Sequence, residues 1–334
     1  MRRYPLYILL AALTLASCEV EFSPNAEWKE IPVVYCLIDQ DDSLTTARVE
    51  RCYLPQGDIY SPSVISDSIN YAPGTIEVAL LAFDSTGRQV DSIALAYTTV
   101  DREPGSFVHT GQPVYQAVTQ GRLRENWRYR ICVRHTDDHS LVASSSLVPL
   151  IGQVSQAVFN KPAYTEYNGV PSGQFSFNRA GATCLIEWDT LQHGRLYQPV
   201  IRLYYSVHGD TTYVDIRASE AVSRGNQPIS ISYGREAFLG AVRDKLKDDT
   251  TTKRYLKQVD LYLSVGSEDY NAYHASLDAG ANISQGREPY TNIEGGLGVF
   301  ASRRTHLHKW MPADSSTLEN GLPAKLRGLG VGFE

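Results

Sequence analysis

The chain has 334 residues, of which 43% are hydrophobic and 20% are charged, a composition typical of a globular protein large enough for two domains. Its 37 acidic residues outnumber its 31 basic residues, and the sequence has no basic stripe. Because nucleic-acid affinity comes largely from Lys and Arg that neutralise phosphates, this balance argues against a nucleic-acid partner. It also argues against direct attraction to an anionic lipid surface.

The first residues have the three parts of a secretory leader. Arg2 and Arg3 form a positive start, an apolar run covers residues 6–15, and small residues precede Cys18. The run is shorter than the about 20 apolar residues that a bilayer-spanning helix needs. An ordinary signal peptidase would favour an Ala-x-Ala-like exit, which this sequence lacks. We therefore expect residues 1–17 to be a lipoprotein signal peptide and Cys18 to carry the lipid.

The mature protein is then expected to start with a lipidated linker over residues 18–26. Its acyl chains, such as palmitate, would hold it in an outer membrane, and each buried methylene contributes about 0.8 kcal/mol to that anchoring. Whether the protein faces the periplasm or the cell surface stays open. No stretch after Cys18 is long and apolar enough to cross a membrane, so the lipid is the predicted anchor.

The first half of the chain has the pattern of short strands separated by turns. Tyr129, Ile131 and Val133 alternate with polar residues, as expected for a half-buried strand. Strands are predicted over residues 31–38, 45–54, 75–83, 89–97, 127–135 and 141–147. No helical period lies between them, so the sequence predicts an immunoglobulin-like β-sandwich over residues 27–148.

The second half, residues 149–334, has a mixed pattern. Apolar residues at helical spacing predict a helix over residues 235–247, and a second helix is expected over residues 268–277 with Ser267 as its N-cap. Strands are predicted over residues 184–188, 199–207, 211–217 and 259–265. The whole chain is therefore expected to be mainly β, with the sandwich followed by an α+β C-terminal domain.

Four cysteines remain besides Cys18, and an exported protein can form two disulfides from them. A hairpin closed near residue 44 would place Cys36 opposite Cys52, at a cross-strand separation close to that of a disulfide. Cys36–Cys52 is therefore the preferred disulfide pairing. The alternative is that both thiols are unpaired and buried as small hydrophobic groups.

One stretch near the C-terminus carries a resemblance. The run Pro289-Tyr290-Thr291-Asn292-Ile293-Glu294-Gly295-Gly296-Leu297-Gly298-Val299-Phe300, together with the lipoprotein start and the β-rich first half, resembles the Bacteroidota outer-membrane lipoproteins of domain-of-unknown-function family 4249. Families of this kind occur with TonB-dependent outer-membrane receptors, and the resemblance supplies no catalytic residues. Their usual first strand has glycine where this chain has Cys36, so the resemblance does not support the disulfide.

The glycines of that run have a physical interpretation of their own. Glycine permits positive φ or a close backbone approach, which suits a bulge or buried turn between apolar residues. The spacing does not match a phosphate-binding loop, because the third glycine is missing and no helix follows. We therefore expect residues 292–300 to be a structural element of the C-terminal domain, with ligand contact as the alternative.

Three groups of residues could in principle bind a metal. They are the alternating pair His306 and His308, the loop acids Asp39, Asp41 and Asp42, and the hairpin residues His135, Asp137, Asp138 and His139. The histidine pair lacks a third ligand, and the acidic loop lacks the glycine and distal glutamate of a calcium loop. A surface strand and solvated turns are the favoured interpretations, so no metal and no cofactor are predicted.

Two classes of function remain. The first is a non-enzymatic binding or accessory subunit that associates with an outer-membrane partner, most simply a TonB-dependent transporter, and helps to capture its substrate. The second is a glycan- or peptide-active enzyme whose site is assembled from distant segments. The sequence has no nucleophile elbow, zinc-protease helix or Walker loop, which favours the first class and predicts no catalytic residues.

Overall fold

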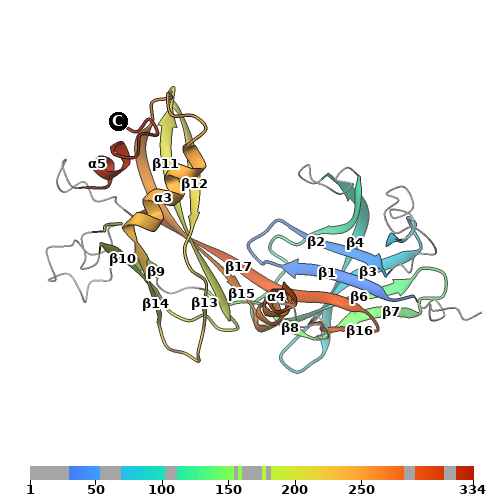
Figure 1. Cartoon of the computed structure of the whole chain (residues 1–334). Helices are drawn as coiled ribbons and strands as arrows, with labels where there is room; N and C mark the ends of the chain where they lie inside the picture. Colours follow the sequence, from blue (N-terminus) through green and yellow to red (C-terminus); the bar gives the residue numbers. More distant parts are fainter. Residues whose placement is uncertain are drawn as a thin grey trace, which may run out of the picture.

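The structure is a computed structural model, and it describes residues 30–52, 69–101, 111–153, 157–159, 175–177, 182–281, 290–311 and 321–334. These residues form a mainly β protein with two lobes, which are joined by one long strand (Figure 1). The predicted fold class is confirmed at this level. Cys18 and the expected linker lie outside the described residues.

The N-terminal lobe is a β-sandwich whose two sheets share one strand. The first sheet has the order β17-β1-β2-β5-β4 and the second has the order β4-β3-β6-β7-β16. The shared strand β4 changes sheets along its length, because its residues up to Leu95 pair with β3 and those from Ala96 pair with β5. The strands are β1 (Pro32–Ile38), β2 (Leu44–Arg51), β3 (Ile76–Phe83), β4 (Gln89–Val100), β5 (Gln112–Val118), β6 (Arg128–His135), β7 (Leu141–Ser145), β8 (Val148–Pro149) and β16 (Ile293–Glu294).

The core of this lobe follows the alternation seen in the sequence. In β1, Val34, Cys36 and Ile38 are buried, whereas the residues between them are half-buried. The second sheet contributes side chains such as Leu80 and Ile131, which pack in the same cluster. Burial of each such side chain contributes about 1.5–3 kcal/mol, so alternation on facing sheets is sufficient to hold the sandwich closed.

The C-terminal lobe has a second core between two sheets and two helices. One sheet has the order β12-β11-β15-β17, with β13 beside β11, and the other has the order β14-β10-β9. Phe238 and Val242 of α3 and Leu326 of α5 are fully buried in this core. The elements are β9 (Ala157–Phe159), β10 (Thr183–Trp188), β11 (Leu196–Val207), β12 (Asp210–Arg217), β13 (Ala221–Val222), β14 (Ile229–Gly234), α3 (Arg235–Leu246), β15 (Tyr255–Gly266), α4 (Glu268–Ala281), β17 (Leu297–Met311) and α5 (Leu322–Arg327).

Strand β17 belongs to both lobes. Its first part, from Leu297 to Ser302, pairs in parallel with β1, and its second part, from Arg303 to Met311, pairs antiparallel with β15. Figure 1 shows this strand running from one lobe into the other. A segment near the end of the chain therefore completes the first lobe, a relationship that the local sequence pattern does not contain.

The predicted Cys36–Cys52 disulfide is not formed, and both thiols are free. The hairpin register explains the error. Cys36 lies opposite Ala47, while the backbone N–H of Cys52 donates to the carbonyl of Ile31 at 2.8 Å. The turn closes nearer to Asp41 and Asp42 than to residue 44, so the two cysteines are separated along the strands instead of facing each other.

The glycine-rich run Asn292–Phe300 is structural, but it lies in the N-terminal lobe and not in the C-terminal domain. Ile293 and Phe300 are buried in the sandwich core. The glycines permit close backbone approach: a Cβ on Gly296 would lie 2.5 Å from the carbonyl oxygen of Pro32. Gly298 has φ +107°, and a Cβ there would lie 2.0 Å from the carbonyl oxygen of Val34. Only glycine fits at these positions against β1.

Candidate functional site

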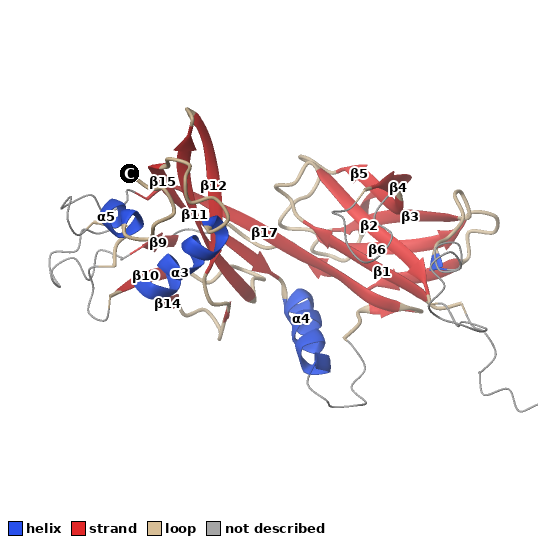
Figure 2. Ribbon diagram, turned by 45° about the horizontal axis from the view of Figure 1, so that its top comes forward, coloured by secondary structure: helices blue, strands red, loops and turns tan. Residues whose placement is uncertain are grey.

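Helix α4 lies where the two lobes meet (Figure 2). It contributes to two adjoining cavities, which we call together the α4 cleft. The first cavity, of about 390 Å³, is lined by Tyr35, Cys36, Leu37, Asp42, Leu44, Thr46, Tyr270, Tyr273, Val299 and Arg303. The second, of about 350 Å³, is lined by Leu37, Leu196, Gln198, Val200, Arg217, Glu220, Ser264, Val265, Gly266, Tyr270, His274, Arg303, Arg304 and Thr305. Because Leu37, Tyr270 and Arg303 line both cavities, the two cavities lie side by side.

Strand alternation supplies the wall of the first cavity. In β1, Val34 and Cys36 point into the sandwich core, which leaves Tyr35 and Leu37 on the opposite face. Tyr35 is in register with Val299 of β17, so the two strands present one continuous surface toward α4. The same periodicity that builds the core therefore also builds the cleft.

Tyrosines of α4 stand against this wall. The ring of Tyr273 meets that of Tyr35 edge-on, with centroids 5.9 Å apart. Burial and a hydrogen bond with Tyr273 raise the pKa of Tyr35 to about 12, so its hydroxyl stays protonated across the physiological range. Tyr270 stacks with His274, with ring centroids 6.3 Å apart.

The end of β15 accommodates Tyr270 through a glycine. A Cβ on Gly266 would lie 2.2 Å from the ring of Tyr270. Ser267 directly precedes α4, at the N-cap position that the sequence predicts, and its carbonyl accepts from the N–H of Asn271 at 2.9 Å. Its side chain also accepts a hydrogen bond from the backbone N–H of Ser302 at 3.3 Å. The start of α4 is thus attached to β17.

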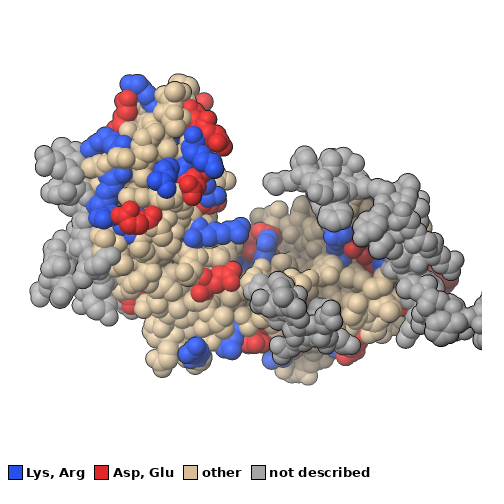
Figure 3. Space-filling model, viewed as in Figure 1, with Lys and Arg blue, Asp and Glu red and all other residues tan. Residues whose placement is uncertain are grey.

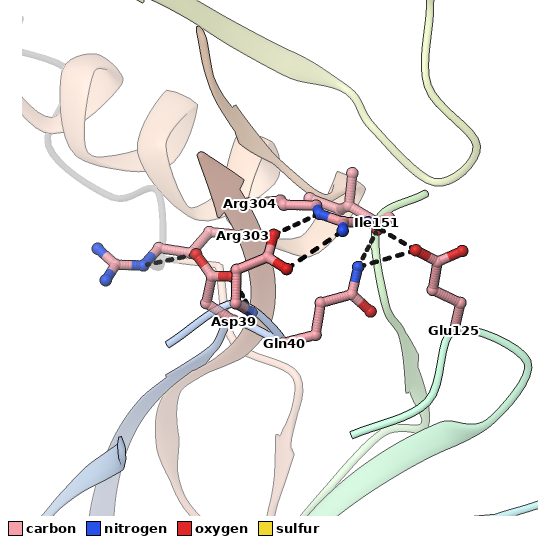
Figure 4. Close-up of polar contacts among 7 residues, drawn as sticks. Asp39, Gln40, Glu125, Ile151, Arg303 and Arg304 are labelled. Atoms are coloured by element: carbon pink, nitrogen blue, oxygen red, sulfur yellow. Dashed lines mark hydrogen bonds and ion pairs between the residues drawn. The ribbon is translucent and has the colours of Figure 1, made fainter. Parts of the chain in front are cut away.

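An ionic network fixes the two lobes at the base of the cleft (Figure 4). We call it the interlobe clasp, and it consists of Asp39, Gln40, Asp41, Asp42, Glu125, the carbonyl of Ile151, Arg303 and Arg304. Arg304 is 5% exposed, and its guanidinium donates to Asp41 at 2.7 Å, to Glu125 at 2.6 Å and to the Ile151 carbonyl at 3.1 Å. Burial acts to lower the pKa of Arg304, but the hydrogen bonds to Asp41 and Glu125 outweigh it and the net shift is upward. The buried charge is therefore compensated.

The remaining clasp contacts lie nearer the surface. Arg303 donates to Asp42 at 3.0 Å, and both side chains are about half exposed. Asp39 is 4% exposed, and burial raises the pKa of its carboxyl, although the backbone N–H of Asp41 donates to it at 3.0 Å. The acidic loop predicted as a solvated turn is in this way a docking element for two arginines.

The charges near the cleft are mixed in sign. Figure 3 shows basic and acidic side chains interspersed over the face in view, including the hollow where the lobes meet. Each of the two cavities contains one acidic residue, Asp42 in the first and Glu220 in the second. Asp42 is already paired with Arg303, so the first cavity has little net charge.

The other residues singled out in the sequence do not converge on this site. His139 lies at the tip of the β6–β7 hairpin and contacts Glu77 at 3.1 Å, and Asp138 accepts from the backbone of Ser140. The backbones of His306 and His308 lie on β17 opposite β15, and their side chains are outside the described residues. Among the residues that the structure describes, no group of three or more His, Cys, Asp or Glu side chains could hold a metal ion.

The sequence reasoning missed the cleft and the clasp. Its nearest signal was the tyrosine enrichment around residues 262–273, combined with the adjacent cations Arg303 and Arg304. The aspartate partners of these arginines come from a loop more than 250 residues earlier, as the 263-residue separation of Asp41 and Arg304 shows, and Glu125 lies 179 residues before Arg304.

Comparisons with known proteins identify neither a family nor a function for this chain. No protein family model matches the chain, so the resemblance to family 4249 stays a prediction. No curated protein matches it. Among solved structures, a DUF4785 family protein from Legionella pneumophila is similar at 10% sequence identity and a TM-score of 0.19, with 70% of this chain covered. The match spans about half of that protein, at 52%, and carries no argument about fold or function. Within the described part of the chain, no helix could span a membrane.

Proposed function

We propose that this protein is a lipid-anchored outer-membrane protein without enzymatic activity, an accessory subunit that captures a ligand in the α4 cleft and associates with a TonB-dependent transporter. The leader and Cys18 support the lipid anchor. The resemblance of the Asn292–Phe300 run to lipoproteins that occur with such receptors supports the choice of partner. The cleft supports a binding role.

The observation that carries the binding role is the composition of the cleft. Tyr35, Tyr270 and Tyr273 offer large, amphipathic ring surfaces, and Arg303 offers a forked donor between the two cavities. Tyrosine and arginine are enriched at the energetically important positions of interfaces, because they bury much surface while keeping a polar end. The combined volume of the two cavities, of about 390 and 350 Å³, falls within the range of small-molecule sites, about 300–1,000 Å³.

The same composition favours binding over catalysis. Glycoside hydrolysis needs two carboxyl groups about 5–9.5 Å apart across the scissile bond. The first cavity has only Asp42, which is bonded to Arg303, and the second has only Glu220, whose carboxylate lies 4.0 Å from the ring of His274. Neither arrangement supplies the acid and base pair that the alternative enzyme would require.

The rigid connection between the two lobes also supports a binding function. Arg304 ties β17 to loops of the N-terminal lobe, and β17 itself pairs with strands of both lobes. A cleft between lobes that are held in this way is formed before its ligand arrives, which lowers the entropic cost of binding.

The experiment is co-purification of the full-length protein from membranes after mild detergent extraction, with its partners identified by mass. We expect a TonB-dependent transporter in stoichiometric amount. Cys18→Ala should prevent fatty-acid incorporation and reduce the membrane-bound fraction, while Cys132→Ala, a buried cysteine far from the leader, should retain both. Recovery without any transporter, or continued fatty-acid labelling of Cys18→Ala, would contradict the proposal.

A further inference from the structure

The second cavity differs from the first in its balance of charge. Arg217 is the last residue of β12, is exposed and lines this cavity, and among the described residues its side chain has no hydrogen-bond or ion-pair partner. Arg304 is already bonded to two carboxylates, and Arg303 is bonded to Asp42. An unpaired guanidinium at the wall of a cavity is a site for a carboxylate, because its planar donors match the two carboxylate oxygens.

A ring surface lies in the same cavity. Tyr270 and His274 are one turn apart on α4, and their rings stack at an interplanar angle of 30°. Both residues line the second cavity, so their rings form part of its surface. Such a surface suits the C–H face of a sugar ring better than a flexible chain.

The remaining polar groups of the cavity suit hydroxyl groups. Both amide hydrogens of Gln198 are committed, because its Nε2 donates to the carbonyls of Pro199 at 3.2 Å and Ala218 at 2.6 Å. Its Oε1 is therefore available only as an acceptor. Nearby, the hydroxyls of Ser264 and Thr305 lie 3.3 Å apart and can each donate or accept. A ligand that reaches these atoms needs hydroxyl groups beside its carboxylate.

We propose that the second cavity is a subsite for an acidic sugar, whose carboxylate pairs with Arg217, whose ring packs against Tyr270, and whose hydroxyls bond to Gln198, Ser264 and Thr305. This inference rests on the proposed capture function, since it names the class of captured ligand. Glu220 lies in the same cavity and weakens binding of the carboxylate, so it limits the preference for acidic over neutral sugars that Arg217 provides.

The test is calorimetric titration of the full chain in detergent with a galacturonic acid trisaccharide and, as the matched ligand, its methyl ester. We expect the acid to bind at least tenfold more tightly than the ester, with an affinity that falls as salt is raised. Arg217→Gln should weaken the acid about tenfold and leave the ester unchanged. Arg224→Gln, an exposed cation outside both cavities, is the charge-matched control and should change neither.

A second variant should change the affinity for the acid in the opposite direction. Glu220→Gln should tighten binding of the acid, because it removes a like charge, whereas a variant that merely disturbs the fold would weaken it. Equal affinity for acid and ester, or equal effects of Arg217→Gln and Arg224→Gln, would overturn the inference.

If the transporter still co-purifies while no acidic sugar binds, the ligand class is wrong and the accessory role stands. If acidic sugars bind without any transporter, the ligand class stands and the partner is wrong.

Discussion

Asp41 and Arg304 are 263 residues apart in the chain, yet the carboxylate of one accepts hydrogen bonds from the guanidinium of the other at 2.7 and 3.3 Å. The contact joins the turn after β1 to the middle of β17, at the point where that strand passes from the first lobe to the second. Because the α4 cleft lies directly beside it, the geometry of the cleft depends on this pair.

Arg304→Gln should therefore destabilise the protein by about 2–3 kcal/mol. Removal of one partner from a buried ion pair costs about 3–5 kcal/mol, and the half-exposed carboxylates of Asp41 and Glu125 reduce that figure here. Arg303→Gln is the matched control and should cost less than about 1 kcal/mol, because its pair with Asp42 is exposed and its contact with buried Asp39 is long, at 3.9 Å. Urea unfolding of both variants measures the difference. Equal losses of unfolding free energy would mean that the burial of Arg304 does not determine how much the interlobe clasp stabilises the protein.

Gly298 and Gly87 separate two causes of strain. Both have positive φ, at +107° and +82°, but a Cβ on Gly298 would lie 2.0 Å from the carbonyl oxygen of Val34, whereas nothing lies within 4 Å of one on Gly87. Gly87→Ala should cost about 1 kcal/mol from backbone conformation alone. Gly298→Ala should cost at least about 2 kcal/mol more or abolish folding.

Thermal unfolding of both variants provides the measurement. Gly296→Val should also destabilise, through the 2.5 Å approach to the Pro32 carbonyl, although φ at Gly296 is not positive. If Gly298→Ala and Gly87→Ala have the same melting temperature, the close packing of β17 against β1 does not constrain the fold.

The side chain of Asn292 joins its own segment to β17 and to α4. Its Nδ2 donates to the carbonyl of Phe300 at 2.8 Å and to Asp269 of α4 at 3.0 Å, and its Oδ1 accepts from the N–H of Phe300 at 2.9 Å. Asn292→Asp keeps the shape but places a carboxylate against Asp269, so it should lower stability by about 2–4 kcal/mol. Asn271→Asp, on α4 with Asp269 but outside this network, should have a smaller effect. Chemical denaturation distinguishes the two, and a neutral Asn292→Asp would contradict the role of Asn292.

The free cysteines give a chemical prediction. Cys36 is 2% exposed, and burial raises the pKa of its thiol to about 12, so it should react with iodoacetamide only on unfolding. Cys52 is partly exposed and should react first in the native protein. Peptide mapping without reductant should recover both as alkylated thiols after denaturation. A peptide in which Cys36 and Cys52 are bridged would contradict the register of β1 and β2.

Local patterns predicted the elements well. The alternation around Tyr129 and Ile131 gave the strand β6, and apolar residues at helical spacing gave α3 within one residue of its observed end at Leu246. Both succeed because burial on one face imposes a period that is visible in the sequence. Cys132, which shares a face with arginines, is nevertheless 5% exposed, and Arg130 and Arg134 lie against its thiol.

Long-range pairing could not be predicted in the same way. The run Asn292–Phe300 was correctly expected to be structural, but nothing in it indicates that it pairs with β1 instead of a strand of the second half. The hairpin register was wrong because the turn position was inferred from symmetry between two cysteines, whereas Asp39, Asp41 and Asp42 are held by arginines of β17. The α4 cleft results from these two pairings, so its position required the tertiary structure.

The most direct test of a capture function is to incubate the purified full-length protein with a defined library of oligosaccharides and short peptides, and to identify what it retains by mass. We expect one compound retained per chain and recovered with its mass unchanged. Tyr270→Ala should lose it, and Tyr213→Ala, an exposed tyrosine outside both cavities, should keep it. Conversion of library members to products of altered mass, at more than one per chain, would contradict the account and identify an enzyme.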